Sequence, residues 1–204
     1  MSQPVQPQRA QTFASLEEFL AWESEQVERY EFVDGIAVAM AGASPRHNAI
    51  EVNLVAALKT AQGRDSIPLG SGQKIRTYTA CGPRSRYADA SVACGDRTFD
   101  KSTLLNPSVI FEILSRRTEA DDRGDKWNEY RKLASLRDYL LVSQRGTLIE
   151  HFQRTNDVWA YRTYEAGQSI VLSDGTTIAV DTVYDRCWSL PSDEADTEQS
   201  QDLA

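Results

Sequence analysis

Apolar residues recur at helical spacing in two segments that begin with favourable N-caps. Ser15 opens the sequence SLEE, which has the form of a capping box, and the pattern after it predicts a helix to about Val27. Ser44 precedes Pro45, a residue favoured at the first helical position, and a second helix is predicted to end near Gly63. The apolar positions of this second helix repeat at helical spacing: Ile50, Leu54, Val55 and Leu58.

A third helix is predicted from Thr118 through Leu133. Thr118 and Asp121 have the spacing of a capping box, and the segment follows a strongly apolar run. A last, short helix is predicted at the end of TTIAVDTVYDRCW, after a strand. Helices are therefore interspersed with extended segments along the chain.

Strands are predicted where apolar residues alternate with polar ones or form short runs bounded by turn residues. The clearest is a hairpin in RYEFVDGIAVAMA, in which Asp34 and Gly35 form the turn. A second hairpin is predicted across Thr155 and Asn156, and the Gly82-Pro83 pair is predicted to form a loop. The remaining strands are expected in GSGQKIRTYT, YADASVACG, SVIFEILS and RDYLLVS.

This order of elements predicts one α/β domain over residues 13–191, since no repeat or linker divides it. The segment 1–12 is expected to be a disordered N-terminus. The segment 192–204 is expected to be a disordered acidic tail, because it is polar and holds many acidic side chains.

Composition narrows the class of protein. At 204 residues, with 41% hydrophobic and 25% charged residues, the chain is typical of a soluble globular domain. It has no apolar run of about 18 residues, the length of a membrane span, and no apolar signal-peptide region. Three cysteines outside any Cys-x-x-Cys pair favour reduced thiols and a cytoplasmic location. Two histidines exclude a histidine-rich metal site, so any metal would be held by oxygen, as Mg²⁺, Mn²⁺ or Ca²⁺ are.

The net charge of −8 argues weakly against a general nucleic-acid binder, but the distribution of charge matters more than the sum. Basic residues occur in pairs close to acids with candidate roles. Each pair could also be an ordinary set of solvated charges. The pairs are Lys74 with Arg76, Arg84 with Arg86, and Arg116 with Arg117.

Two carboxylates interrupt otherwise apolar strands, Asp89 and Glu112. An ionised carboxylate in such a place loses hydration unless something compensates for it. Two strand carboxylates that converge on one point are typical of a Mg²⁺ site in phosphoryl chemistry, because Mg²⁺ takes one or two carboxylates and keeps several waters. The alternative is that each acid pairs with an arginine or faces solvent at a sheet edge.

The helix that follows Glu112 carries Asp122, Lys126 and Tyr130 at steps of four, which predicts that they share one face. A lysine that faces a carboxylate pair and a metal can orient the attacking water or stabilise charge that develops on a phosphate. The alternative is a surface Asp–Lys pair, which contributes a few tenths of a kcal/mol.

Several blocks in this order and spacing resemble the Uma-two family of restriction-endonuclease-like proteins: SLEEFLAW, RYEFVDGIAVAM, GASPRHN, DASV, LLNPSVIFEILS, TEADDRGDKWNEYRKL and SLRDYLLV. The resemblance covers roughly residues 12–188. The family is assigned to the PD-(D/E)xK nuclease superfamily. The resemblance therefore implies a restriction-endonuclease-like core, a mixed β-sheet flanked by helices, with an added N-terminal helix and β-hairpins. It also implies Mg²⁺- or Mn²⁺-dependent hydrolysis of a DNA phosphodiester.

Carried over to this chain, the resemblance assigns Asp89 and Glu112 as catalytic metal ligands. Ala88 replaces the usual proline before Asp89, which matters little because the carboxylate is retained. Leu114 stands where the motif has its lysine. The family is thought to place that lysine on the following helix, which maps it to Lys126 as the third catalytic residue.

Further residues match recurrent family positions or lie beside the motif. Glu31 is a candidate helper carboxylate, or a simple partner for an arginine. His47, at a helix start, is expected to be held neutral by the helix dipole and to donate or accept hydrogen bonds. Gln73, Asp122 and Tyr130 are candidate helper or substrate-contacting residues.

The expected function is a divalent-metal-dependent endodeoxyribonuclease, with DNA as partner, no membrane association and a homodimer that presents two sites to two strands. Two alternatives stay open. One is a catalytically inactive DNA- or protein-binding module on a nuclease fold, and the other is a hydrolase of a small phosphoester.

Overall fold

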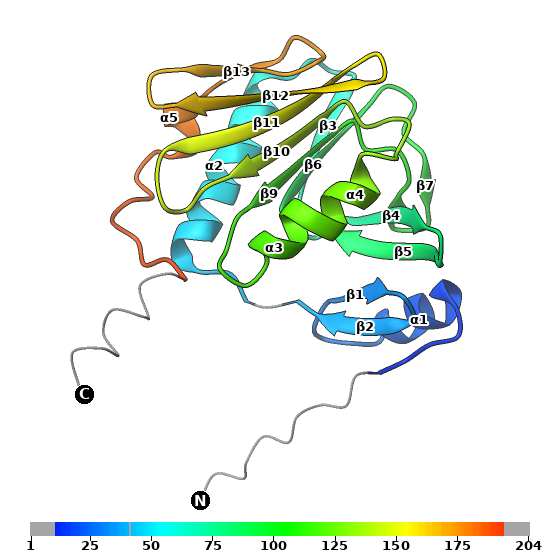
Figure 1. Cartoon of the computed structure of the whole chain (residues 1–204). Coiled ribbons are helices and arrows are strands. Elements are labelled where there is room, and N and C mark those ends of the chain that lie inside the picture. Colours follow the sequence, from blue (N-terminus) through cyan, green and yellow to red (C-terminus); the bar gives the residue numbers. More distant parts are fainter. Residues whose placement is uncertain (1–10, 41, 194–204) are drawn as a thin grey trace, which may run out of the picture.

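A computed structural model describes residues 11–40 and 42–193 of the chain. Its centre is a six-stranded sheet in the order β12-β11-β10-β9-β6-β3 (Figure 1). Strands β9 and β10 pair in parallel and all other neighbours in this sheet are antiparallel. The strands are β3 (Ser66–Gly70), β6 (Ala90–Cys94), β9 (Val109–Ile113), β10 (Asp138–Val142), β11 (Leu148–Thr155) and β12 (Val158–Glu165).

A second six-stranded sheet has the order β2-β1-β5-β4-β8-β7, with one parallel pair, β4 and β8. Its strands are β1 (Tyr30–Val33), β2 (Ile36–Ala39), β4 (Lys74–Thr79), β5 (Gly82–Tyr87), β7 (Phe99–Asp100) and β8 (Thr103–Leu104). A two-stranded sheet of β13 (Ser169–Val171) and β14 (Thr177–Ala179) completes the set. The predicted fold class, mixed sheet with flanking helices and added hairpins, is confirmed.

The helices lie on both faces of the central sheet (Figure 1). The longest, α2 (Pro45–Ala61), packs on one face, and a composite helix of α3, a π turn η1 and α4 lies on the other. No helix in the described ranges is long and apolar enough to cross a membrane. The helices are α1 (Leu16–Glu23), α2, α3 (Glu119–Asp121), η1 (Asp122–Lys126), α4 (Trp127–Tyr130) and α5 (Val180–Val183).

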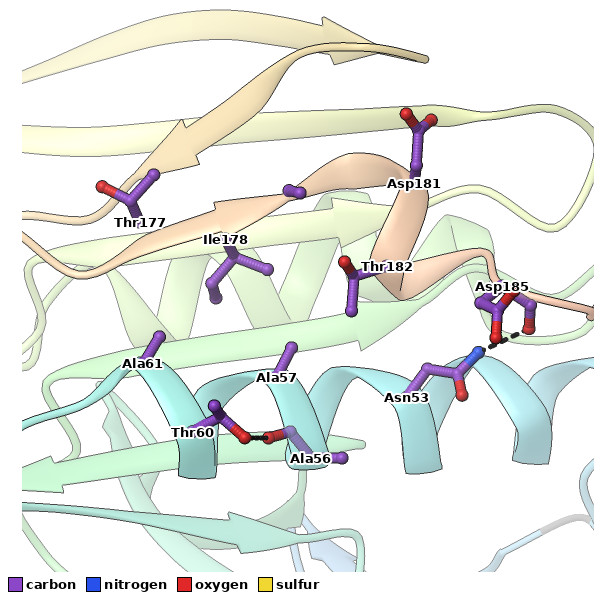
Figure 2. Close-up of a pocket in the computed structure, with 11 residues that line it drawn as sticks. Asn53, Ala56, Ala57, Thr60, Ala61, Thr177, Ile178, Asp181, Thr182 and Asp185 are labelled. Carbon is purple, nitrogen blue, oxygen red and sulfur yellow. Dashed lines mark hydrogen bonds between the residues drawn. The ribbon is translucent and has the colours of Figure 1, made fainter.

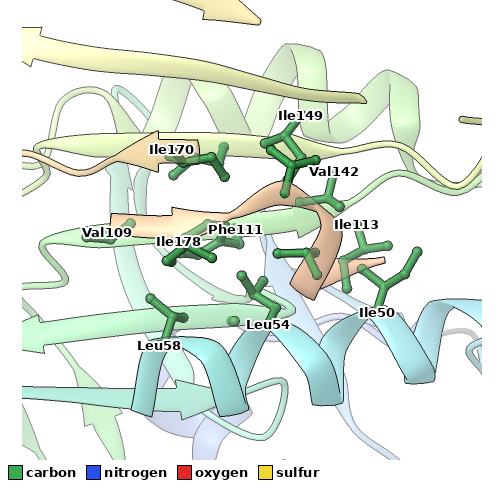
Figure 3. Close-up of a cluster of buried hydrophobic side chains, with 14 of the residues drawn as sticks. Ile50, Leu54, Leu58, Val109, Phe111, Ile113, Val142, Ile149, Ile170 and Ile178 are labelled. Atoms are coloured by element: carbon green, nitrogen blue, oxygen red, sulfur yellow. The ribbon is translucent and has the colours of Figure 1, made fainter. Parts of the chain in front are cut away.

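The main core lies between α2 and the central sheet (Figure 3). Leu54 and Leu58 of α2 pack against odd-numbered residues of β9, such as Val109 and Phe111. The even-numbered Ile110 packs instead into a second cluster on the other face. This alternation follows from the two-residue period of a strand, so Glu112 shares its face with Ile110 and not with the α2 core.

Both predicted hairpin turns and the start of α2 are confirmed. Asp34 and Gly35 take positive φ angles of 49° and 86°, the conformation that a tight two-residue hairpin turn requires. Val158 pairs with Thr155 across the second hairpin. Ser44 accepts a hydrogen bond from the backbone N–H of His47, as an N-cap should.

Four local predictions are wrong. Helix α1 ends at Glu23 instead of Val27, and Thr118 makes no side-chain capping bond at the start of α3. The Gly82-Pro83 pair starts strand β5, because Pro83 lies next to Gly82 at the end of the β4–β5 ladder, where little pairing is lost. Strand β3, with Pro68 at its centre, was not predicted; it is an edge strand, where proline is tolerated.

Residues 11 and 12, which the sequence assigned to the N-terminal segment, pair with strand β2. The carbonyl of Gln11 accepts a hydrogen bond from Ala37 N at 2.9 Å, and Thr12 forms a β-bridge with Ile36, so both belong to the folded part. At the other end Ser192 is buried. The rest of the two predicted disordered segments, 1–10 and 194–204, lies outside the described residues.

Candidate active site

Asp89 and Glu112 lie close together in the central sheet, at the start of strand β6 and the end of the neighbouring strand β9. Asp89 lies in the bend between β5 and β6, and the β6–β9 register pairs Ala90 with Phe111, so the next step sets Asp89 opposite Glu112. Asp89 Oδ2 accepts a hydrogen bond from the backbone N–H of Ile113 at 2.6 Å. The side chain of Glu112 is buried, whereas 18% of the Asp89 side chain is exposed.

Lys126, the last residue of the π turn, reaches this pair of carboxylates. Its Nζ lies 3.1 Å from Glu112 Oε1 and 3.1 Å from Asp122 Oδ1, and it donates a hydrogen bond to the carbonyl of Tyr87 at 3.3 Å. The predicted shared face of Asp122 and Lys126 is confirmed. Neither Glu112 Oε1 nor Asp122 Oδ1 has a partner with hydrogen-bond geometry in the described part of the chain, so their contacts with Lys126 are ion pairs of imperfect alignment.

Glu31 joins the cluster from β1 of the second sheet. Its Oε1 accepts a hydrogen bond from the N–H of Tyr87 at 2.9 Å and lies 3.9 Å from Lys126 Nζ. Its Oε2 accepts from Arg86 Nη1 at 2.8 Å. Glu31 is therefore the partner of an arginine, and it also lies beside Lys126 of the cluster.

His47 contacts Asp89 from the first turn of α2, with Nε2 3.3 Å from Asp89 Oδ2. Burial disfavours the imidazolium, but the hydrogen bond to Asp89 and the charges of Asp89 and Glu51 outweigh it, so the pKa of His47 is raised. The expectation of a histidine held neutral by the helix dipole is wrong, because the adjacent carboxylate has the stronger effect.

Tyr130 and Gln73 differ in their surroundings and in their hydrogen bonds. The hydroxyl of Tyr130 is buried without a hydrogen-bond partner among the described residues, and burial, then the charges of Glu112 and Glu31, raises its pKa well above the usual value. The amide of Gln73 donates to the carbonyls of Lys74 and Ser102. Gln73 thus links two backbone segments, and the structure does not bring it into the carboxylate cluster.

The cluster holds more negative than positive charge. Burial, and the charges of Asp122 and Asp89, raise the pKa of Glu112 well above its usual value despite the nearby ammonium of Lys126. Asp89 behaves in the opposite way, because the hydrogen bond and charge of His47, with the charge of Lys126, outweigh burial and lower its pKa. One carboxylate is thus kept ionised while its neighbour is driven toward the protonated form, a separation typical of functional sites.

The donor set fits a divalent cation that binds oxygen. Glu112 Oε1 is a buried acceptor without a hydrogen bond, and Asp89 opens to solvent beside it. The described ranges contain no group of three or more His, Cys, Asp and Glu side chains arranged as a closed metal site. Mg²⁺ does not need one, since it is commonly bound through one or two carboxylates and keeps several waters.

A network of buried charges, which was not predicted from the sequence, lies next to the cluster and supports it. Glu129 of α4 accepts hydrogen bonds from Arg86, Arg84 and Thr77, and all four side chains are buried. Arg84 also pairs with Asp34. The alternation of arginines in RSRY could have indicated that both point to one face, but this required β5 to be recognised as a strand.

Of the basic pairs in the sequence, Arg84 with Arg86 is not accessible to DNA and Arg116 with Arg117 is exposed. Arg84 and Arg86 are 8% and 2% exposed and are bound to carboxylates, so they are not a surface for phosphate. Arg116 and Arg117 are exposed on the loop between β9 and α3. Trp127 and Trp159 are partly buried and pack into the aromatic cluster under α4, whereas Trp188 is exposed.

The larger surface pocket is elsewhere. It has a volume of about 580 Å³ and lies between α2 and the β14–α5 segment (Figure 2). Ala57, Thr60 and Ile178 are among its lining residues, and Asn53 Nδ2 at its end donates to the carbonyl of Asp185. Its charged lining residues are Asp181 and Asp185, and its lining residues include no lysine, arginine or histidine. A second pocket, of about 370 Å³, lies at the carboxyl ends of β9 and β10 and includes Leu114 in its lining.

The candidate site is thus two carboxylates at the ends of neighbouring strands and a lysine of the covering helix, in a mixed α/β core with helices on both faces, and the comparisons with known proteins identify its family. Residues 16–182 match the family model Uma2, described as "Putative restriction endonuclease". The chain belongs to the Uma2 family.

Relatives in Synechocystis sp. are themselves uncharacterized. Protein slr1290 is 33% identical over 177 residues, which is 83% of this chain and 90% of the relative. Protein sll1609 is 30% identical over 143 residues, 69% of this chain and 80% of the relative. A crystal structure from Anabaena variabilis, described as "a putative nuclease belonging to DUF820", matches with a TM-score of 0.61 and 13% identity, covering 83% of this chain and 96% of that one. At this identity the structural match establishes the fold.

Proposed function

We propose that this protein is an endodeoxyribonuclease that hydrolyses DNA phosphodiester bonds with Mg²⁺ or Mn²⁺. The observation that carries the proposal is the convergence of Asp89, Glu112 and Lys126 at the start of strand β6 and the end of strand β9. Membership of the Uma2 family supports it.

Asp89 and Glu112 would hold the cation, and Asp89 is oriented for this by His47 and by the N–H of Ile113. The bound cation would polarise the scissile phosphate and lower the pKa of a water. The ammonium of Lys126 stabilises negative charge as it develops on the phosphate oxygens, because it is fixed in place before the reaction begins.

The DNA backbone is proposed to follow the loop that joins β9 to α3. Arg116 and Arg117 are exposed there, between the strand that carries Glu112 and the helix that carries Lys126. In the adjacent pocket at the carboxyl ends of β9 and β10, Arg123 pairs with Glu119 and Glu150, and Arg145 pairs with Glu119. Although the chain is acidic overall, the exposed residues Arg116 and Arg117 lie beside the site, where they can attract phosphate.

The protein is further proposed to act in the cytoplasm as a homodimer. Cys81, Cys94 and Cys187 are all free thiols, which supports a reducing compartment. Two copies related by a twofold axis would present two sites to the two strands of a duplex. Sedimentation equilibrium measures the second point directly, and a monomer at all concentrations would remove it.

The central experiment uses purified protein and supercoiled plasmid with Mn²⁺, with Mg²⁺ or with EDTA. Nicked and linear products are expected only with the metals. Asp89→Asn, prepared in the same way, should give no product above background. Cleavage at equal rates by wild type and Asp89→Asn would identify a contaminant, and no cleavage under any condition would contradict the proposed activity.

A further inference from the structure

Arg86 holds together three separate parts of the protein. Its side chain, on β5, is buried and donates hydrogen bonds to three carboxylates. It reaches Glu31 of β1 at 2.8 Å and Asp121 of α3 at 3.1 Å. It also makes a two-point contact with Glu129 of α4, at 2.6 and 3.1 Å. Because a guanidinium has donors in a fixed planar fork, these contacts fix the positions of β1, α3 and α4 relative to β5. They also compensate the charges of the three carboxylates.

The neighbouring residue completes the arrangement. The N–H of Tyr87 donates to Glu31 Oε1, and the carbonyl of Tyr87 accepts a hydrogen bond from Lys126 Nζ. Residues 86 and 87 therefore contact Glu31 twice and Lys126 once. In this way the strand β5 is connected directly to the two charged groups that flank Glu112 in the cluster.

We propose that Arg86 is a positioning residue that fixes the π turn of the composite helix and thereby holds Lys126 against Glu112. Asp121 lies immediately before the π turn and Glu129 follows it in α4. The guanidinium of Arg86 therefore binds the composite helix on both sides of Lys126. A π turn is a rare interruption of a helix and is found often at functional sites, so it requires support from its surroundings. The catalytic meaning of this inference rests on the proposed nuclease function, but the positioning itself does not.

Arg84 provides a matched control within the same network. It lies two residues earlier on β5, so its side chain has the same direction, and it too is buried and bound to Glu129. Its other partners are Asp34 in the β1–β2 turn and, at 4.0 Å, Asp125 of the π turn, and neither Asp121 nor Glu31 is among them. A change at Arg84 therefore disturbs the buried charges without releasing the helix on the near side of the π turn.

The experiment compares Arg86→Lys with Arg84→Lys. Lysine keeps the positive charge, so no carboxylate is left facing an apolar replacement, but it lacks the planar fork. Amide hydrogen exchange is followed for the segment 122–127 relative to strand β10, and Mn²⁺ affinity is measured by calorimetry. We expect Arg86→Lys to speed exchange in the segment by about tenfold or more, the size expected for a lost charged hydrogen bond. Mn²⁺ affinity should change as well, because Lys126 is no longer held beside Glu112.

The control should speed exchange in the segment 122–127 clearly less than Arg86→Lys does, because Arg84 contacts this segment only through Asp125 at 4.0 Å. Equal effects of the two variants, or normal exchange in Arg86→Lys, would overturn the proposal. If either lysine variant fails to fold, Asp121→Asn and Asp34→Asn make the same comparison, because Asp121 binds Arg86, Asp34 binds Arg84, and both carboxylates are partly exposed. A wild type without nuclease activity would contradict the proposed function, whereas the exchange result would still decide the role of Arg86.

Discussion

Lys126 Nζ lies 3.1 Å from Glu112 Oε1, although one residue belongs to a helix and the other to a central strand. The strand position that would place a lysine on the same face as Glu112 is occupied by Leu114, which packs in the apolar cluster with Tyr130. The ammonium of Lys126 therefore reaches Glu112 from the helix that covers this face. Substitutions at these and neighbouring residues test that relationship and the site around it.

Lys126→Met should lower the rate of plasmid cleavage by about 100-fold or more, as for loss of a group that stabilises developing charge. Methionine retains most of the apolar side chain, so the circular dichroism spectrum should be unchanged and Mn²⁺ should still bind. Single-turnover cleavage measures the effect. Full activity in this variant would show that the lysine serves only the structure.

The double variant Lys126→Met with Leu114→Lys moves the ammonium to the strand. Because Leu114 and Glu112 share a face, partial recovery of cleavage over Lys126→Met is expected. Leu114 is buried, so the melting temperature of the double variant must be measured to separate lost folding from lost chemistry.

Divalent metal should stabilise the wild-type protein by binding only the folded state. At a Mn²⁺ concentration of about 100 times Kd the gain is roughly 2.7 kcal/mol. For a chain of this size that corresponds to roughly 5–10 °C in Tm. Differential scanning fluorimetry across a Mn²⁺ series measures it, and Asp89→Asn should lose most of the gain. An identical shift in wild type and variant would place the metal elsewhere.

Without metal, Glu112→Gln should stabilise the protein at neutral pH. The pKa of Glu112 is raised in the folded state above its ordinary value of 4.5, so its contribution to stability is fully present below that value and is lost as pH rises toward the folded pKa. Glutamine resembles the protonated form and removes this loss. Urea titrations at acidic and neutral pH should show a gain in the free energy of unfolding at neutral pH, with little difference in acid. A less stable variant at neutral pH would indicate that the pair with Lys126 outweighs burial.

Binding of duplex DNA should weaken steeply with salt, with a log–log slope near −0.9 per phosphate neutralised. Changing Arg116 and Arg117 together to alanine should flatten the slope by up to about 2 units, measured by fluorescence anisotropy with a catalytically inactive Asp89→Asn background. Arg97 and Arg137 lie at the opposite edge of the central sheet, after β6 and before β10, so the same double change there should leave the slope as it was. Equal flattening by both pairs would remove the proposed DNA path.

The proximity of Asp89 to Glu112 could be predicted from the sequence because each is a polar residue beside apolar ones, although Asp89 lies in the bend before β6 and not within a strand as expected. The shared face of Asp122 and Lys126 follows in the same way from their spacing. Local patterns of this kind depend on a few neighbouring residues, and most of the helices and strands could be predicted from them.

The role of Arg86 could not be predicted in this way. Its partners Glu31, Asp121 and Glu129 come from three elements that meet only in the folded chain, and nothing in the local sequence distinguishes a buried arginine from a solvated one. The raised pKa of His47 could not be predicted for the same reason. The helix that carries His47 could be recognised in the sequence, whereas its contact with Asp89 depends on the folded chain.

The π turn at 122–126 also divides the composite helix into two phases. Each residue added to or removed from a helix rotates everything beyond it by about 100°. Asp121 before the turn and Glu129 after it both face Arg86 only because the turn sets the angle between the two halves. Deletion of one residue within the turn would rotate one half out of contact, whatever residue was removed. This stretch can therefore accept a change of side chain at a position outside the cluster, such as Gly124, where an added Cβ would meet no atom within 4 Å, far more easily than a change of length.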